Sequence, residues 1–97
     1  MPAYVTLFNF TEQGIRNVKD SPERAKAAAK ALESMGGRFI GIWWLVGQYD
    51  GIVIMEAPND EVVTQFAMMT GIQGNIRTTT MRAFGEDEVA KLIGGLP

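Results

Sequence analysis

The pattern of apolar and polar residues along the chain changes period several times, and each change marks an element of secondary structure. Four segments are rich in aromatic, β-branched and threonine residues, which favours strands. They are residues 3–10, 39–46, 52–57 and 76–84. Between them, apolar residues recur at helical spacing over 21–35 and again from about residue 60. The order β-α-β-β-α-β predicts an α+β, ferredoxin-like fold, in which two helices cover one face of a four-stranded antiparallel sheet.

The residues at the boundaries support this division. Ser21 and Pro22 suit a helix N-cap and first helical position, and Gly36-Gly37 suits the end of that helix. Asn59 or Asp60 is expected to cap the second helix. Residues 11–20 are predicted to be a polar connector, and a short C-terminal helix is expected after the acidic residues at 86–88.

The predicted hairpin of residues 39–57 is apolar on both faces, where a sheet with one wet face should alternate. With a two-residue turn, one face receives Ile40, Ile42, Trp44, Val46, Val53 and Met55. The opposite face receives Phe39, Gly41, Trp43, Leu45, Ile52, Ile54 and Glu56. Two helices can cover only one of these faces, and a monomer rarely exposes so large an apolar surface. We therefore expect a homodimer or higher homo-oligomer that packs sheet to sheet.

Composition excludes several classes of function. The 97 residues form a single domain, 1–97, with a net charge of −2, which argues against nucleic-acid binding. The basic residues between Arg16 and Lys30, Arg24 among them, alternate with acids and are interpreted as a solvated helix face. The chain contains neither cysteine nor histidine, so disulfides, thiolate or histidine catalysis and the common zinc and haem ligand sets are excluded. No metal site and no cofactor are predicted.

The first ten residues, MPAYVTLFNF, lack the basic start of a signal peptide, and no apolar run reaches the length of a membrane span. These observations predict a cytoplasmic protein without a membrane partner.

Several segments together resemble the GYD domain family, whose signature Gly-x-Tyr-Asp is present as Gly47-Gln48-Tyr49-Asp50. The resembling segments are YVTLF (4–8), TEQGI (11–15), SPER (21–24), GQYDGIVIMEAP (47–58), GNIRTTTMRAF (74–84) and EDEV (86–89). The family is similar to the dimeric α/β-barrel superfamily, so the resemblance implies two sheets closing around a shared interior. Relatives in that superfamily include cofactor-independent monooxygenases, isomerases and ligand-sensing domains, and fold alone does not choose among them.

Tyr49 and Asp50 are the first candidate site. In one interpretation Asp50 is a general base or ligand anchor at the barrel rim and Tyr49 is its hydrogen-bonding partner. In the other, which the Asp-Gly sequence favours, Asp50 bonds a nearby backbone N–H and the pair is turn chemistry.

The open sheet face is the second candidate site, because polar groups that converge in an apolar interior are typical of small-molecule sites. The polar residues expected there are Thr6, Glu56, Thr78, Thr80 and Arg82, beside Tyr4, Phe8, Phe10 and Trp43. The alternative is that Glu56 and Arg82 form a structural ion pair, or that either of them lies at the rim in water. Trp43 is expected to be core packing or the wall of a ligand pocket.

Three functions remain open. The chain could bind or sense a small metabolite between the sheets of a dimer. It could be a cofactor-independent enzyme acting on a small organic substrate, with Tyr49, Asp50 or Glu56 moving protons and Arg82 holding an anion. It could also be a purely structural assembly protein.

Overall fold

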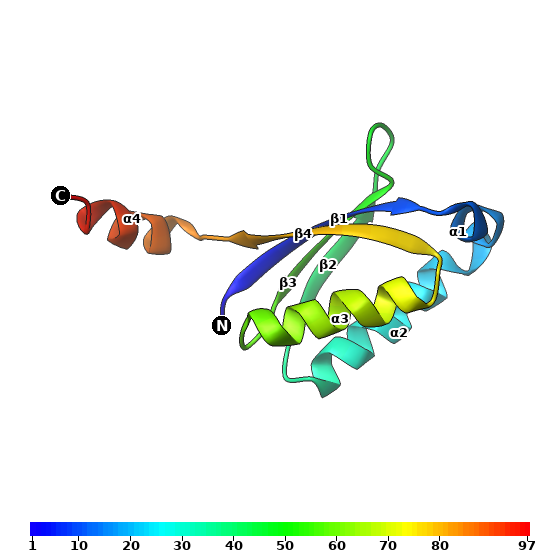
Figure 1. Ribbon diagram of the computed structural model, residues 1–97, viewed down its shortest axis with the longest axis horizontal. Helices are drawn as coiled ribbons and strands as arrows, with labels where there is room; N and C mark the ends of the chain where they lie inside the picture. The colour runs from blue at the N-terminus through cyan, green and yellow to red at the C-terminus, as the bar shows by residue number, and fades with distance from the viewer.

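The chain forms one four-stranded antiparallel sheet with two long helices on one face, the α+β, ferredoxin-like architecture that the sequence predicts (Figure 1). The computed structural model describes all residues from Met1 to Pro97. Its elements are β1 (Ala3–Phe10), α1 (Glu12–Arg16), a 3₁₀ turn (Val18–Asp20), α2 (Ser21–Ser34), β2 (Arg38–Trp44), β3 (Gly51–Glu56), α3 (Asp60–Ile72), β4 (Ile76–Ala83) and α4 (Glu86–Gly94). The strand order is β2-β3-β1-β4, so β2 and β4 are the edges.

The register decides which side chains lie under α2 and α3. In β1, Tyr4 pairs with Met55 and Thr6 pairs with Val53, and all four side chains are buried. The even-numbered residues of β1 therefore point toward the helices, and the odd-numbered ones point to the uncovered face. We call these the helix face and the open face.

A small core lies between the helix face and the two helices. Its buried apolar residues are Tyr4, Phe8, Leu32, Val53, Met55, Ala57, Val63 and Phe66. Side chains from the sheet and both long helices meet there, so the core fixes the helices against the sheet. Nothing within the chain covers the open face, where Trp43 is 52% exposed.

Two boundaries differ from the sequence prediction. Residues 11–20 are not an irregular connector, because Thr11 caps the short helix α1 by accepting a hydrogen bond from the backbone N–H of Gly14. Ser21 does not cap α2. It is the first residue of that helix, and its Oγ accepts a hydrogen bond from Trp44 Nε1 at 3.0 Å. By contrast Asn59 caps α3 as predicted, accepting from the backbone N–H of Val62.

The hairpin also differs in detail. The register shifts between Phe39 and Gly41, which places Phe39 opposite Met55 on the helix face. Phe39 therefore packs against the core, whereas the regular two-residue pairing assigned it to the open face. Strand β2 ends at Trp44, so residues 45–50 form a longer loop than expected.

Helix α4 lies apart from the rest of the chain, at the end of an arm that continues β4 (Figure 1). Its apolar residues Leu92 and Ile93, and Leu96 just beyond its end, are 55%, 61% and 69% exposed. The molecule measures 51 × 31 × 18 Å, and its radius of gyration of 14.6 Å exceeds the roughly 13 Å of a compact domain of this length. None of the helices combines the length and apolar character needed to cross a bilayer.

Candidate functional site

The candidate site residues, which the sequence predicted to share one interior, lie on two different faces of the sheet. Thr78, Thr80 and Arg82 of β4 pair with Phe8, Thr6 and Tyr4, so these six side chains share the helix face. Glu56 pairs with Ala3 and Trp43 pairs with Ile52, which places Glu56 and Trp43 on the open face. The prediction of a single shared interior was wrong, because the alternation within β1 leaves open which of its faces meets the helices.

A small cavity, which we call the inner cavity, lies between the helix face and the two long helices. Its volume is ≈ 80 Å³, and ten of its seventeen lining residues are hydrophobic. The lining includes residues of β1, the start of α2, the end of α3 and the start of β4. Thr6 and Thr78, two of the predicted site residues, are part of this lining.

A second hollow, which we call the outer groove, lies between α3 and the edge strand β4. Its volume is ≈ 430 Å³. It is lined by Tyr4, Asp60, Val63, Thr64, Ala67, Thr78, Thr80 and Arg82. Ala67 and Thr78 line both hollows, so the inner cavity and the outer groove adjoin beneath α3.

Tyr4 and Asp60, which both line the outer groove, form a short hydrogen bond. The Tyr4 hydroxyl donates a hydrogen bond of 2.6 Å to Asp60 Oδ1 in the first turn of α3, and the tyrosine itself is buried. This bond to the carboxylate, together with burial, raises the pKa of Tyr4 above 10.0. Tyr4 therefore stays protonated and acts as a hydrogen-bond donor near neutral pH.

Arg82 links the groove to the arm. Its guanidinium carbon lies 5.8 Å from the centre of the Tyr4 ring and 4.4 Å from that of Phe84. Nη2 donates to Glu88 Oε2 at 2.8 Å, and this bond holds the pKa of Glu88 below its usual value. Nη1 donates to the backbone oxygens of Ala3 and Ala83. Arg82 is thus occupied in positioning α4, and an anionic ligand in the groove would compete with Glu88 for it.

The threonines form the middle of the site. Thr6 Oγ1 and Thr80 Oγ1 are 2.8 Å apart, and Thr6 is buried. A hydroxyl pair of this kind satisfies both groups without a ligand, because each hydroxyl can donate and accept.

The predicted pairing of Glu56 with Arg82 does not occur. Glu56 Oε1 lies 3.4 Å from Nη1 of Arg38, its cross-strand neighbour in β2. The Arg38 side chain is 70% exposed and that of Glu56 is 25% exposed, so this partly solvated pair at the sheet edge contributes little to stability.

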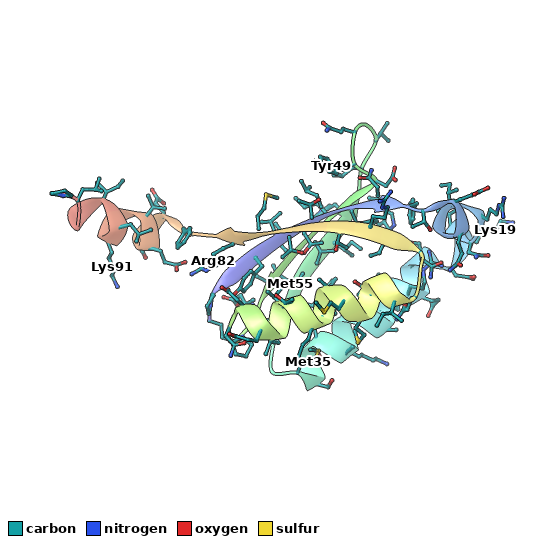
Figure 2. The ribbon with its side chains drawn as sticks, viewed as in Figure 1. Lys19, Met35, Tyr49, Met55, Arg82 and Lys91 are labelled. Carbon is teal, nitrogen blue, oxygen red and sulfur yellow. The ribbon has the colours of Figure 1, made fainter.

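Tyr49 and Asp50 lie in the β2–β3 loop. Tyr49 is far from Arg82 (Figure 2). The Asp50 carboxylate accepts a hydrogen bond of 2.8 Å from the backbone N–H of Phe10, and the Asp50 backbone N–H donates to Phe8 O. These contacts match the turn interpretation of Asp50. The signature pair therefore does not join the outer groove.

Two residues that matter here were missed from sequence. Asp60 was interpreted as a helix-start acid, and nothing in its spacing indicates Tyr4, 56 residues earlier, as a partner. Arg24 was assigned to a solvated helix face, yet it lines the inner cavity and its Nη2 is buried without a hydrogen-bond partner. The alanines that follow Arg24 on the same helix stripe were the only available signal.

No group of three or more acidic side chains is arranged to hold a metal ion.

The chain is similar to known proteins in three comparisons. A family model described as "GYD domain" matches residues 4–93. A protein of Thermus thermophilus, named "Glutamine synthetase and cystathionine beta-lyase binding protein", is 29% identical over 97 residues, which cover 99% of each chain. The solved structure of FFRP-DM1 superposes with a TM-score of 0.57 and 22% identity, over 87% of this chain and 100% of that one. At that identity the last comparison supports the fold alone.

Proposed function

The chain belongs to the GYD domain family, and from this premise we propose that it is a protein-binding module that acts as a homodimer and contacts a metabolic enzyme. Its Thermus relative is named as a protein that binds two enzymes, and the likeness extends over the whole of both chains. A binding role of this kind needs surface rather than a catalytic centre.

The observation that carries the proposal is that two separate apolar surfaces have no cover within one chain. The first is the open face, formed by Val5, Leu7, Trp43, Ile52, Ile54 and Met81. The second is the apolar stripe of α4, formed by Val89, Leu92 and Ile93 and continued by Leu96 just beyond the helix end, all exposed. Exposed apolar surface on this scale is typical of protein–protein contact sites.

We assign the open face to a second copy of the chain. The face is broad, and a two-fold axis through it would pair each apolar patch with its own equivalent. Burying Trp43 and the isoleucines of β3 there would add the apolar core that the small monomer lacks.

The partner enzyme is assigned to α4. The spacing of Val89, Leu92, Ile93 and Leu96 is i, i+3, i+4, i+7, the pattern with which an amphipathic helix enters an apolar groove on another protein. A helix of nine residues is marginal alone in water, so packing against a partner would stabilise it.

Surface plasmon resonance tests this assignment, with purified glutamine synthetase and cystathionine β-lyase from the organism that encodes this chain. We expect the wild-type chain to bind at least one of the two enzymes. The double variant Leu92→Ser/Ile93→Ser should lose at least tenfold in affinity, whereas Lys91→Ser, outside the apolar stripe of α4, should bind normally. Absence of binding to both enzymes, or normal binding by the double variant, would contradict the proposal.

Light scattering coupled to gel filtration tests the dimer separately. Ile54→Arg places a charge in the centre of the open face and should give a monomer. Val46→Arg, the same kind of change at a fully exposed loop position, should remain a dimer. A wild-type chain of monomer mass at micromolar concentration would refute the assignment of the open face.

A second candidate function is the binding of a small metabolite, and the two adjoining hollows favour it. Thr6, Thr78, Thr80 and Arg82 remain candidate contacts, now beneath the helices. A ligand between the sheets of a dimer would instead contact Glu56 and Trp43. A thermal-shift screen of small metabolites on the wild type and on Thr78→Val tests the first location, because only a ligand under the helices should lose its stabilising effect in the variant.

A further inference from the structure

The inner cavity has an unusual charge balance. Arg24, in the first turn of α2, is the only charged residue among the seventeen that line it, and the lining contains no aspartate or glutamate. Most of the remaining lining is apolar, including Phe39, Ile42 and Phe66. A half-buried cationic side chain thus lines an apolar hollow whose lining contains no acidic partner.

The Arg24 guanidinium is only partly satisfied by the protein. Nη1 donates to the backbone oxygen of Asn17 at 2.9 Å. Nη2 is buried and has no hydrogen-bond partner. A buried donor without a partner is costly, more so when it carries charge, and folded proteins rarely leave one.

We propose that the inner cavity binds a short-chain aliphatic carboxylate, whose carboxylate group pairs with Arg24 and whose tail lies among the apolar side chains. A carboxylate suits this position because a planar guanidinium recognises its two oxygens with charge-assisted hydrogen bonds. An apolar hollow with a single fixed polar anchor is also the usual design of a small-molecule site.

The size of the cavity limits the tail. A cavity of about 150 Å³ lined by aliphatic and aromatic side chains accommodates benzene. The inner cavity measures ≈ 80 Å³, about half of that. A branched tail of three or four carbons, as in isovalerate, therefore fits better than an aromatic ring or a long chain. This inference rests on the second candidate function, small-metabolite binding, and names its ligand class. It does not depend on the protein-binding role, and either can fail without the other.

Isothermal titration calorimetry on the full chain tests the proposal with three probes. Isovalerate is expected to bind with saturation. Isovaleramide, its uncharged analogue, should bind at least tenfold more weakly, because it cannot supply the anionic partner. Octanoate should also bind more weakly, because its chain exceeds the cavity. Equal binding of the acid and the amide, or no saturable binding of isovalerate up to 10 mM (on the order of the weakest affinities worth measuring), would overturn the proposal.

Matched variants locate the site. Arg24→Gln should reduce isovalerate affinity at least tenfold, whereas Arg16→Gln, which removes an exposed arginine of α1, should leave it unchanged. If Arg24→Gln does not fold, Arg24→Lys provides the same test. This variant keeps the charge but lacks the planar guanidinium. It should bind isovalerate more weakly than the wild type does, but more tightly than the wild type binds isovaleramide. Unchanged affinity in a folded Arg24 variant would place the carboxylate elsewhere and refute the assignment.

Discussion

At the scale of single residues, two members of the family signature, Gly47 and Asp50, have clear roles in the geometry of the β2–β3 connection. Gly47 has φ of +139°, which residues with a side chain rarely adopt. Asp50 extends the pairing of β1 with β3 by one hydrogen bond, because its carboxylate accepts a hydrogen bond from the backbone N–H of Phe10. Gly51 leaves room for the Phe8 ring, whose atoms would overlap a Cβ at this position. Gly47 and Asp50 of the signature, and Gly51 just after it, thus support the geometry of the β2–β3 hairpin.

Removing the Asp50 carboxylate should weaken the fold. Asp50→Ala leaves the Phe10 N–H without its acceptor, and we expect the free energy of unfolding to fall by about 1–3 kcal/mol. Asp50→Asn keeps an acceptor oxygen, so it should lose less and leave the oligomer intact. Urea denaturation followed by tryptophan fluorescence measures both. Equal losses in the two variants would show that charge, rather than the hydrogen bond, is the important property.

Two glycine-to-alanine changes should act in opposite directions. Gly51→Ala forces a methyl group into the Phe8 ring and should cost about 1–3 kcal/mol, the usual cost of overpacking. Gly71→Ala lies in α3 with open space around its Cβ, and should gain up to about 1 kcal/mol of helix propensity. Thermal unfolding of both variants beside the wild type tests this. A neutral Gly51→Ala would mean that the Phe8 ring moves freely, contrary to its buried position.

At the scale of elements, the sequence predicted the four strands and the helices other than α1, but not how β1 lies on the sheet. Periodicity identifies a strand, yet β1 is apolar on both sides: Val5 and Leu7 on one, Tyr4 and Phe8 on the other. Only the long-range pairing of Thr6 with Val53 and Thr80 reveals which side meets the helices. That one unknown determined where most of the candidate site lies.

Local irregularities were equally hidden in the sequence. The bulge after Phe39 moves one aromatic ring from the open face to the core, and a count of alternating positions assumes no bulge. Arg24 looked like one of several exposed cations, because its burial depends on how α2 is set against the sheet. The capping by Asn59 and the end of α2 just before Gly36 were predictable, since those signals are local.

The link between β1 and α3 gives a prediction for alkaline pH. The pKa of Tyr4 is higher in the folded chain than in the unfolded chain, where it is near 10.0. The folded state therefore holds this proton more tightly, and the resulting stability is present below about pH 10 and is lost as pH rises through the folded pKa. Tyr4→Phe should remove this contribution, so its unfolding free energy should decline less steeply above about pH 10 than that of the wild type.

Urea unfolding in steps from pH 9 to pH 11 measures this difference, roughly the window set by an ordinary tyrosine pKa near 10. Tyr49→Phe is the matched control, because it removes a tyrosine hydroxyl that has no bond to Asp60. Parallel declines in the wild type and in Tyr4→Phe would show that the Tyr4–Asp60 bond does not contribute to the pH dependence.

At the scale of the whole molecule, the buried core is small and much apolar surface is exposed. Only 12 of 97 residues are buried, although nearly half of the sequence is hydrophobic. The arm that carries α4 is tied to the end of β4 by the Arg82–Glu88 ion pair. A small core of this kind supplies little stability alone, so assembly should contribute much of it.

The melting temperature should therefore depend on protein concentration. If folding and dimerisation are linked, a hundredfold increase in chain concentration raises the melting temperature, because mass action favours the dimer. Differential scanning fluorimetry from about 1 to 100 μM spans the affinities of most specific dimers and tests this. Ile54→Arg should melt lower and show no such dependence. A concentration-independent melting temperature in the wild type would indicate that one chain is stable alone.

The β2–β3 loop has a consequence for engineering. Hydrogen bonds fix its base, where Leu45 N–H donates to Asp50 O and the Asn9 side chain donates to Gln48 O, but its tip at Val46-Gly47 stands clear of the rest of the chain. A tip that is exposed between fixed ends is a site where foreign sequence is tolerated. A short epitope or a fluorophore-binding peptide grafted between Val46 and Gly47 should leave the hairpin paired, and would give this protein a reporter that lies outside its core, its groove and its arm.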